Sequence, residues 1–184
     1  MAEEFGMSCA SILYVNPHTY PLEARVFRKM SDIEHDLVIW SKHLDIDDLF
    51  APMRAELFHG ANPDMSVKVL KIFYDLGVTT RRIEYYLLNT QGKGYLLNRE
   101  SIHTLVSMGM KPISVLMFMA ASMVRVYSGS KSRAIEAQVV ALKKEGMSFE
   151  EMKDYFLREF FPKKDEDDIM PKFMMALGAI YAQA

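Results

Sequence analysis

The stretch Pro112-Ile-Ser-Val-Leu-Met-Phe-Met-Ala-Ala-Ser-Met-Val-Arg-Val126 decides the predicted fold. Between Ile113 and Val126, 11 of 14 residues are apolar, and no polar side recurs at helical or strand spacing. A helix that is apolar all round is buried or lies in a membrane. Spanning a bilayer takes about 20 apolar residues, and this run is bounded by Lys111 and Arg125. We therefore predict an all-α fold of about eight or nine helices, stacked as hairpins around a central helix at residues 112–126 and buried on all sides there.

Composition sets the broad class of the protein. The chain has 184 residues, half of them hydrophobic and a quarter charged, with a net charge of −2. Proteins built mainly to bind phosphate backbones are usually basic, so nucleic acid is not the default partner. One cysteine, Cys9, excludes an internal disulfide and fits a reducing compartment. With no secretory signal at its start, the chain is expected inside the cell, in the cytoplasm or an organelle matrix.

The first half of the chain predicts an N-terminal arm at residues 1–20, then a single helical domain over residues 21–184. Proline is favoured at the first helical position, so Pro21 is expected to begin a long helix. Its apolar positions recur at steps of three and four and predict packing on another helix: Leu22, Val26, Met30, Ile33, Leu37, Trp40 and Leu44. Whether that partner belongs to this chain or another stays open, with this chain favoured. A cap or turn is expected at Asp45 and Asp47, and a further helix from Pro52.

A repeated pattern follows over residues 65–160. Three times the sequence predicts a helix, a glycine and a second helix, with the glycines at Gly77, Gly109 and Gly146, 32 and 37 residues apart. Glycine ends helices because it adopts positive φ at little cost. An apolar residue follows each glycine by six positions and an aromatic residue by nine; the aromatics are Tyr86, Phe118 and Tyr155. This spacing is typical of stacked helical hairpins.

The repeat resembles organellar helical-repeat families. Residues 78–112 close with Leu105-Val-Ser-Met-Gly-Met-Lys-Pro112, which resembles the end of a pentatricopeptide repeat, and residues 134–146 resemble the second helix of another. The glycine turns are also similar to those of mitochondrial transcription termination factor repeats. The resemblance implies a helical face that binds nucleic acid or a structural role in an organellar ribosome. In the pentatricopeptide register the base-reading positions fall on Tyr86, Phe118 and Tyr155, where that family has small polar residues.

The sequence does not predict catalysis or metal binding. His35 and His43 are eight residues apart, without the spacing of a zinc motif. No nucleophile elbow or phosphate loop is present in the sequence. We therefore expect no enzyme activity, no catalytic residues, no metal and no cofactor.

Nucleic-acid binding has some support from basic residues beside aromatic ones. Arg81 and Arg82 begin a predicted helix that carries Tyr85 and Tyr86. If the hairpins stack, further cations are expected along the same edge: Lys93, Lys111, Lys131 and Arg133. Cations next to aromatic rings bind single strands with little sequence preference. The simpler interpretation places the aromatics in the core and the cations in solvent.

The leading hypothesis is a non-enzymatic interaction or scaffold subunit of a larger protein or ribonucleoprotein assembly, with no small-molecule substrate. Its contact surfaces would be the stripe of residues 22–44 and the Met-rich C-terminal helix. The 15 methionines suit either core packing or an adaptable docking groove. The alternatives are an organellar single-stranded RNA-binding repeat protein and a viral nucleoprotein-like RNA-packing protein.

Overall fold

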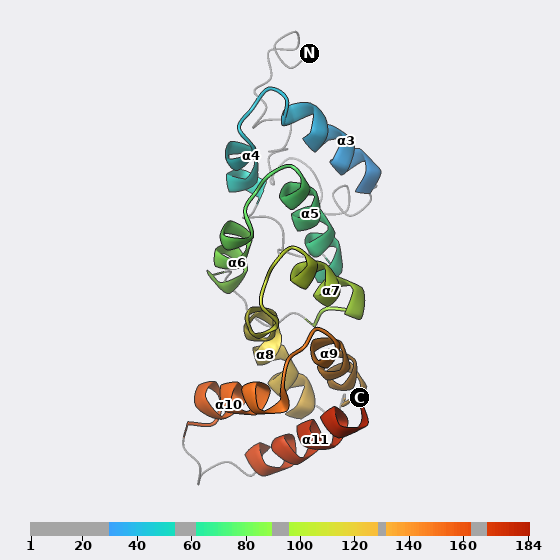
Figure 1. The fold of residues 1–184 in the computed structure, drawn as a ribbon, viewed down its shortest axis with the longest axis vertical. Helices are drawn as coiled ribbons and strands as arrows, with labels where there is room; N and C mark the ends of the chain where they lie inside the picture. Colours follow the sequence, from blue (N-terminus) through green and yellow to red (C-terminus); the bar gives the residue numbers. More distant parts are fainter. Residues whose placement is uncertain (1–29, 54–61, 90–95, 129–131, 163–168) are drawn as a thin grey trace. The chain divides into compact units, whose positions relative to one another are not determined.

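The computed structural model describes residues 30–53, 62–89, 96–128, 132–162 and 169–184. Within these ranges the chain forms nine helices and no strand, which confirms the all-α prediction. In order along the chain (Figure 1) they are α3 (Met30–Trp40), α4 (Ile46–Met53), α5 (Pro63–Asp75), α6 (Thr80–Asn89), α7 (Arg99–Ser107), α8 (Pro112–Ser128), α9 (Ser132–Lys144), α10 (Phe149–Glu159) and α11 (Ile169–Gln183).

The chain divides into two compact units, Met1–Ile83 and Glu84–Ala184, and the division falls within α6. The units are described separately below as unit 1 and unit 2. The predicted single domain over residues 21–184 stays a prediction, and the predicted arm at residues 1–20 lies outside the described residues.

In unit 1, α3 packs on α5, so the part of the apolar stripe that lies on α3 has a partner within the chain, as favoured from the sequence. Leu37 is fully buried, and the rings of Phe50 and Phe73 meet edge to face at 5.1 Å. The stripe does not stay helical to Leu44, however. Helix α3 ends at Trp40, and a turn over residues 41–43 separates it from α4.

The prediction that a helix begins at Pro52 is wrong. Helix α4 begins at Ile46 and holds Pro52 next to its last residue. The side chain of Asp45 accepts a hydrogen bond from the backbone N–H of Asp47 at 2.8 Å, which satisfies a donor that the helix start leaves open. Carboxylates at Asp47 and Asp48 also favour a helix start here, through the helix dipole.

The three glycine turns are the same structure repeated. Gly77, Gly109 and Gly146 have φ of 112°, 91° and 90°. At each turn the glycine N–H donates to the carbonyl three residues back, and the next residue donates to the carbonyl five residues back. These paired bonds define a Schellman motif. The residue after each glycine is buried, and the residues are Val78, Met110 and Met147.

Each turn leads directly into the next helix. Ser148 begins α10 with a capping box, in which its hydroxyl accepts from the Glu151 N–H and the Glu151 carboxylate accepts from the Ser148 N–H. The Ser148 hydroxyl also donates to the Glu151 carboxylate at 2.7 Å, and this bond, together with the one from the Ser148 N–H, lowers the pKa of the Glu151 carboxyl group. Pro112 occupies the first position of α8, where its missing N–H costs nothing. The local sequence therefore fixes both the end of one helix and the start of the next.

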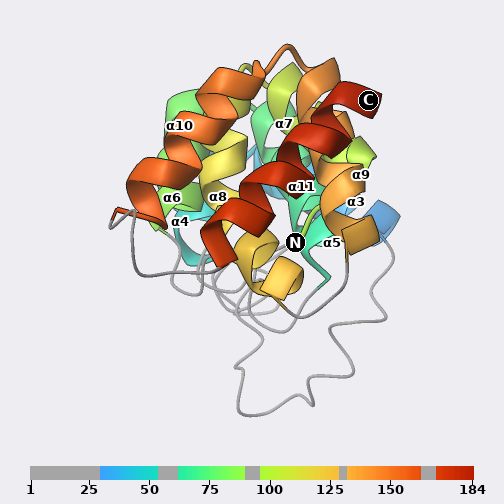
Figure 2. The ribbon, with the colours of Figure 1, turned by 90° about the horizontal axis from the view of Figure 1, so that it is seen from below.

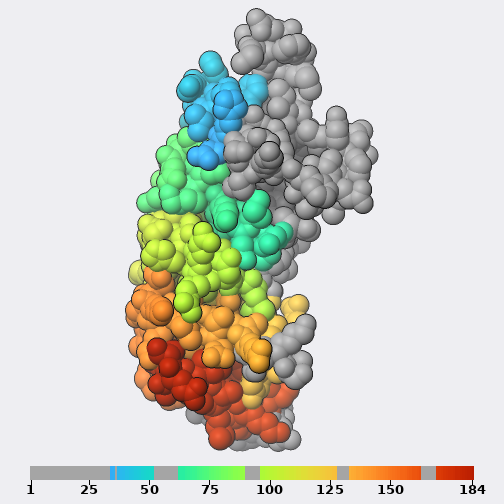
Figure 3. Space-filling view, turned by 90° about the vertical axis from the view of Figure 1, so that its right-hand side faces the viewer, coloured from blue at the N-terminus to red at the C-terminus, as the bar shows by residue number. Residues whose placement is uncertain are grey.

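Unit 2 is a stack of hairpins in two layers. Helices α8 and α10 pack together in one layer, while α7 and α9 pack together in the other, and α11 packs on α8, α9 and α10. Seen from below, α8 and α10 lie on one side and α7 and α9 on the other, with α11 crossing in front of them (Figure 2). The space-filling view shows the side of unit 2 on which α7, α9 and α11 follow one another (Figure 3).

Helix α8 is central in unit 2, as predicted. It packs against α7, α9, α10 and α11. The core includes Val115, Leu116 and Phe118 of α8, all with 0 % exposure. On α11, Phe173 and Leu177 face inward one turn apart, and Phe173 meets the ring of Phe156 on α10 at 4.8 Å.

Candidate interaction surface

The predicted basic edge is only partly described by the structure. Arg81 is exposed on α6, whereas Arg82 forms an ion pair with Asp47 inside unit 1. Lys93 and Lys131 lie outside the described residues. The ion pair gives Arg82 a role within the fold, which competes with any role in binding phosphate.

Lys111 and Arg133 are both exposed, but they do not share an edge. Lys111 immediately precedes α8, and Arg133 follows its far end, on the first turn of α9. Helix α8 has 17 residues, which corresponds to a length of about 25 Å at 1.5 Å per residue. The two cations therefore lie near opposite ends of α8.

Two of the three repeated aromatic positions are filled by core residues. Phe118 has 0 % exposure and Tyr155 has 7 %, and Tyr86 is partly buried. Burial raises the pKa of the Tyr155 hydroxyl, with a further contribution from the nearby Glu159 carboxylate. The rings of Phe118 and Tyr155 are enclosed by neighbouring helices and offer no face for a nucleic-acid base, which supports the interpretation that placed these two in the core.

The predicted partner-contact residues lie mostly on or before α3. Leu37 is fully buried within unit 1, and Trp40 is partly buried. Met30 and Ile33 belong to α3, but the structure does not describe their side chains. Leu22 and Val26 lie outside the described residues. The role of these six residues in binding a partner stays a prediction. Leu37 is already part of the core of unit 1.

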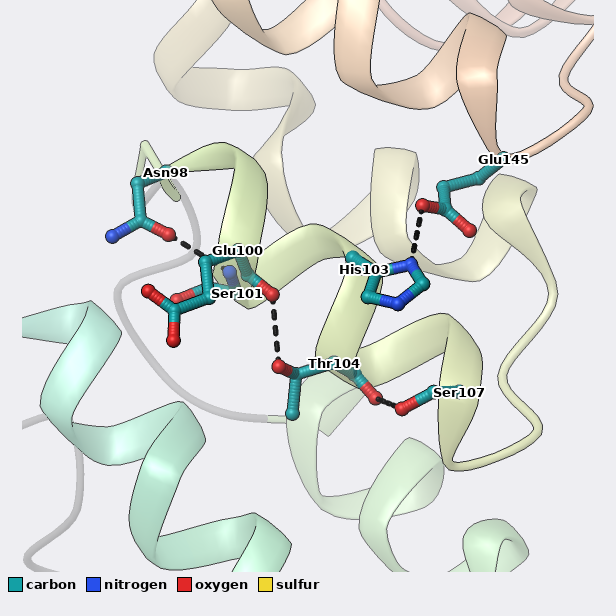
Figure 4. A network of polar contacts seen from close by, with 7 residues as sticks. All are labelled: Asn98, Glu100, Ser101, His103, Thr104, Ser107 and Glu145. Atoms are coloured by element: carbon teal, nitrogen blue, oxygen red, sulfur yellow. Dashed lines mark hydrogen bonds and ion pairs between the residues drawn. The ribbon is translucent and has the colours of Figure 1, made fainter.

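A polar network joins α7 to the end of α9 (Figure 4). Asn98 caps α7 by accepting from the Ser101 N–H at 2.8 Å, and Nδ1 of His103 lies 2.9 Å from a carboxylate oxygen of Glu145. The side chain of Glu145 is only 17 % exposed. The network braces the glycine turn at Gly146 against the neighbouring hairpin, which is a structural role.

The surface that sequence reasoning missed is the solvent side of α8. Met117 is 38 % exposed, and Ile113 and Ala121, one turn to either side of it, are partly exposed. We call these three residues the outer stripe of α8. The prediction that this helix is buried on all sides is wrong here, because the helices packed against it leave one side uncovered.

Helix α8 is hydrogen-bonded to α6 and packs on α10. Tyr85 on α6 is 67 % exposed. The residue before it on α6, Glu84, accepts a hydrogen bond through its carboxylate from the buried Ser114 of α8. Helix α10, which also packs on α8, carries the exposed residues Glu151 and Asp154. The outer stripe ends near a cation on each side along α8, since the exposed Lys111 precedes Ile113 and the exposed Arg125 stands four residues after Ala121.

The glycine register could have located this surface. Tyr85, Met117 and Asp154 each stand eight residues after a turn glycine, and all three are exposed. In the helix that follows each turn glycine, the eighth position therefore faces solvent. The repeated aromatic position is the next residue. The signal was present, but an aromatic, a methionine and an aspartate do not form a recognisable motif.

Comparison with known proteins finds no matching family model, no matching curated protein and no matching solved structure. The resemblance to organellar repeat families thus rests on the sequence features that suggested it. Among the helices described, none is both long and apolar enough to cross a membrane. Nor do three His, Cys, Asp or Glu side chains of the described residues come together in a group that could hold a metal ion.

Proposed function

We propose that this protein is a non-enzymatic helical-hairpin subunit that binds another protein within a larger assembly. The observation that carries the proposal is the outer stripe of α8, where apolar side chains reach solvent in the middle of a helical stack.

The composition of α8 supports this proposal. A helix with one side in solvent ordinarily carries charged or polar residues on that side, yet residues 112–124 include no charged residue. A single exposed apolar residue needs no explanation, whereas a contiguous group bordered by polar residues is typical of an interaction site. Here Met117 is continued along α8 by the partly exposed Ile113 and Ala121.

Single-stranded RNA binding is the second candidate function. It is favoured by the exposed ring of Tyr85, with the exposed Arg81 one helical turn before it. Base stacking on an exposed ring contributes about 1–3 kcal/mol per base. The net charge of −2 weighs against it, because proteins built mainly to bind phosphate backbones are usually basic.

The test is purification of the tagged full chain from its own cells, with and without nuclease, at low and high salt. We expect a protein partner in stoichiometric amount that is retained after nuclease treatment and at high salt, because burial of apolar surface is not screened by ions. Partners lost with nuclease, together with RNA lost steeply as salt rises, would contradict the proposal and support the RNA-binding alternative. A chain recovered alone under every condition would contradict both.

A further inference from the structure

We propose that Met117 is a site of oxidative modification, at which a peroxide converts the thioether to the sulfoxide and thereby changes the outer stripe of α8 from apolar to polar. This inference rests on the proposed function and deepens it, since it names a way in which the same surface is regulated.

Helix α8 carries three methionines, and they differ in their access to solvent. Met117 is 38 % exposed, whereas Met119 and Met123 have 0 % exposure. Protein interiors are close-packed, with few voids larger than a water molecule, so a peroxide reaches a buried sulfur only when the helices open. Because all three thioethers belong to one helix, the difference in exposure is expected to direct oxidation to Met117.

The core of unit 2 shows the same contrast. It includes four further methionines, each at most 3 % exposed: Met108, Met110, Met147 and Met152. Oxidation of any of these sulfurs would place a polar oxygen among apolar side chains and weaken the fold. A modification that leaves the fold intact therefore falls on a methionine in solvent, and Met117 is the only sulfur-containing residue of the outer stripe.

The chemical step transfers one oxygen atom and two electrons. The sulfur of Met117 attacks the hydroxyl oxygen of the peroxide, so that an S–O bond forms while the O–O bond breaks. The other oxygen takes up the released proton and leaves as water, or as an alcohol where the peroxide is organic. The sulfur is oxidised and the peroxide is reduced. A thiol-dependent reductase reverses the change, since the oxygen leaves as water while two thiols become a disulfide.

The product changes what the outer stripe can bind. The sulfoxide oxygen accepts hydrogen bonds from water, and it lies in a row whose other members, Ile113 and Ala121, are apolar. A partner that covers this row has to remove that water, and burial of a polar group without a hydrogen bond is unfavourable. We therefore expect the oxidised chain to bind its partner about tenfold more weakly. Oxidation acts on the free chain, because a bound partner shields the sulfur.

The first test maps oxidation on the purified full chain. The folded chain is exposed to hydrogen peroxide, and mass spectrometry of its peptides follows the gain of one oxygen at each methionine. We expect Met117 to react at least about tenfold faster than Met119 and Met123, and a chain unfolded in urea to lose this difference. Met175, which is 76 % exposed on α11, is the internal standard for a methionine in solvent. Equal rates at the three methionines of folded α8 would overturn the inference.

The second test measures binding of the partner that is retained with the tagged full chain. The chain is separated from that partner, treated with peroxide, and recombined with it. We expect a loss of about tenfold in affinity, restored by methionine sulfoxide reductase with dithiothreitol. Met117→Leu keeps an apolar side chain of similar size, and its affinity is expected to be the same before and after peroxide. The matched control, Met175→Leu, is expected to lose affinity as the unchanged chain does.

The outcomes separate the inference from the proposed function. Undiminished binding by a chain fully oxidised at Met117, or an equal loss in Met117→Leu, overturns the inference and leaves the proposed function intact. A chain that has no partner before peroxide treatment contradicts the proposed function, and with it the regulation inferred here. Far-ultraviolet circular dichroism before and after treatment establishes that the chain stays folded.

Discussion

Replacing Phe118 by alanine is expected to lower the free energy of unfolding by about 3–5 kcal/mol, the usual cost of removing a large buried ring. Phe118 has 0 % exposure and lies on α8, which packs against four other helices of unit 2. Loss of the ring therefore leaves a cavity that those helices cannot all move to fill. Domains of ordinary size have about 5–15 kcal/mol of stability in total, so this one change removes a large share of it.

The matched control is the neighbouring residue. Met117→Ala alters the same helix at a side chain that is 38 % exposed, and is expected to cost less than about 1 kcal/mol. Urea unfolding followed by circular dichroism measures both variants. If Phe118→Ala does not fold, Phe118→Leu, which keeps part of the buried volume, is measured in its place. Equal effects at positions 117 and 118 would contradict the inward and outward faces assigned to α8.

Replacing Gly146 by valine is expected to be the second largest effect, with a loss of at least about 1–2 kcal/mol in the free energy of unfolding. The backbone at Gly146 has φ of +90°, and an added Cβ would meet no atom within 4 Å. The loss would therefore come from the backbone conformation alone and not from a steric clash. Because the Schellman turn at Gly146 sets where α9 ends and α10 begins, part of that hairpin is expected to become less ordered.

An asparagine variant tests whether the positive φ at Gly146 is the cause of this loss of stability. Gly146→Asn is expected to cost less than Gly146→Val, because asparagine tolerates the left-handed region better than branched residues do. Gly77, with φ of +112° and equally open space around its Cα, should show the same order of variants. The measurement is again urea unfolding, with hydrogen exchange of α9 and α10 as a local readout. Valine and asparagine variants of equal stability would show that the positive φ is not required.

The repeat could be predicted from the sequence because its determinants are local. A glycine, a buried residue after it and a capping residue after that specify each turn within a few positions, and all three turn glycines have the predicted positive φ. The central position of α8 was also predictable, since an apolar run of that length needs neighbours on most of its sides.

The remaining features depend on how helices are placed in space. Whether the outer stripe of α8 is covered depends on how many helices surround it, and no residue of the stripe carries that information. The separation of Lys111 from Arg133 depends on the length of the helix between them and on the alternation of turns. Pro52 was assigned to a helix start from its own preference, while the cap at Asp45 determines where α4 begins.

The most direct test of the account is photo-crosslinking from the outer stripe. A photoreactive amino acid replaces Met117 in the full-length chain, and in a parallel sample it replaces Met175; both are irradiated in an extract of the cells that make the protein. We predict one discrete adduct with another protein from position 117 and none from position 175. An adduct from position 175 alone would contradict the assignment of the binding surface to α8, and no adduct from either position would contradict the account of this chain as a protein-binding subunit.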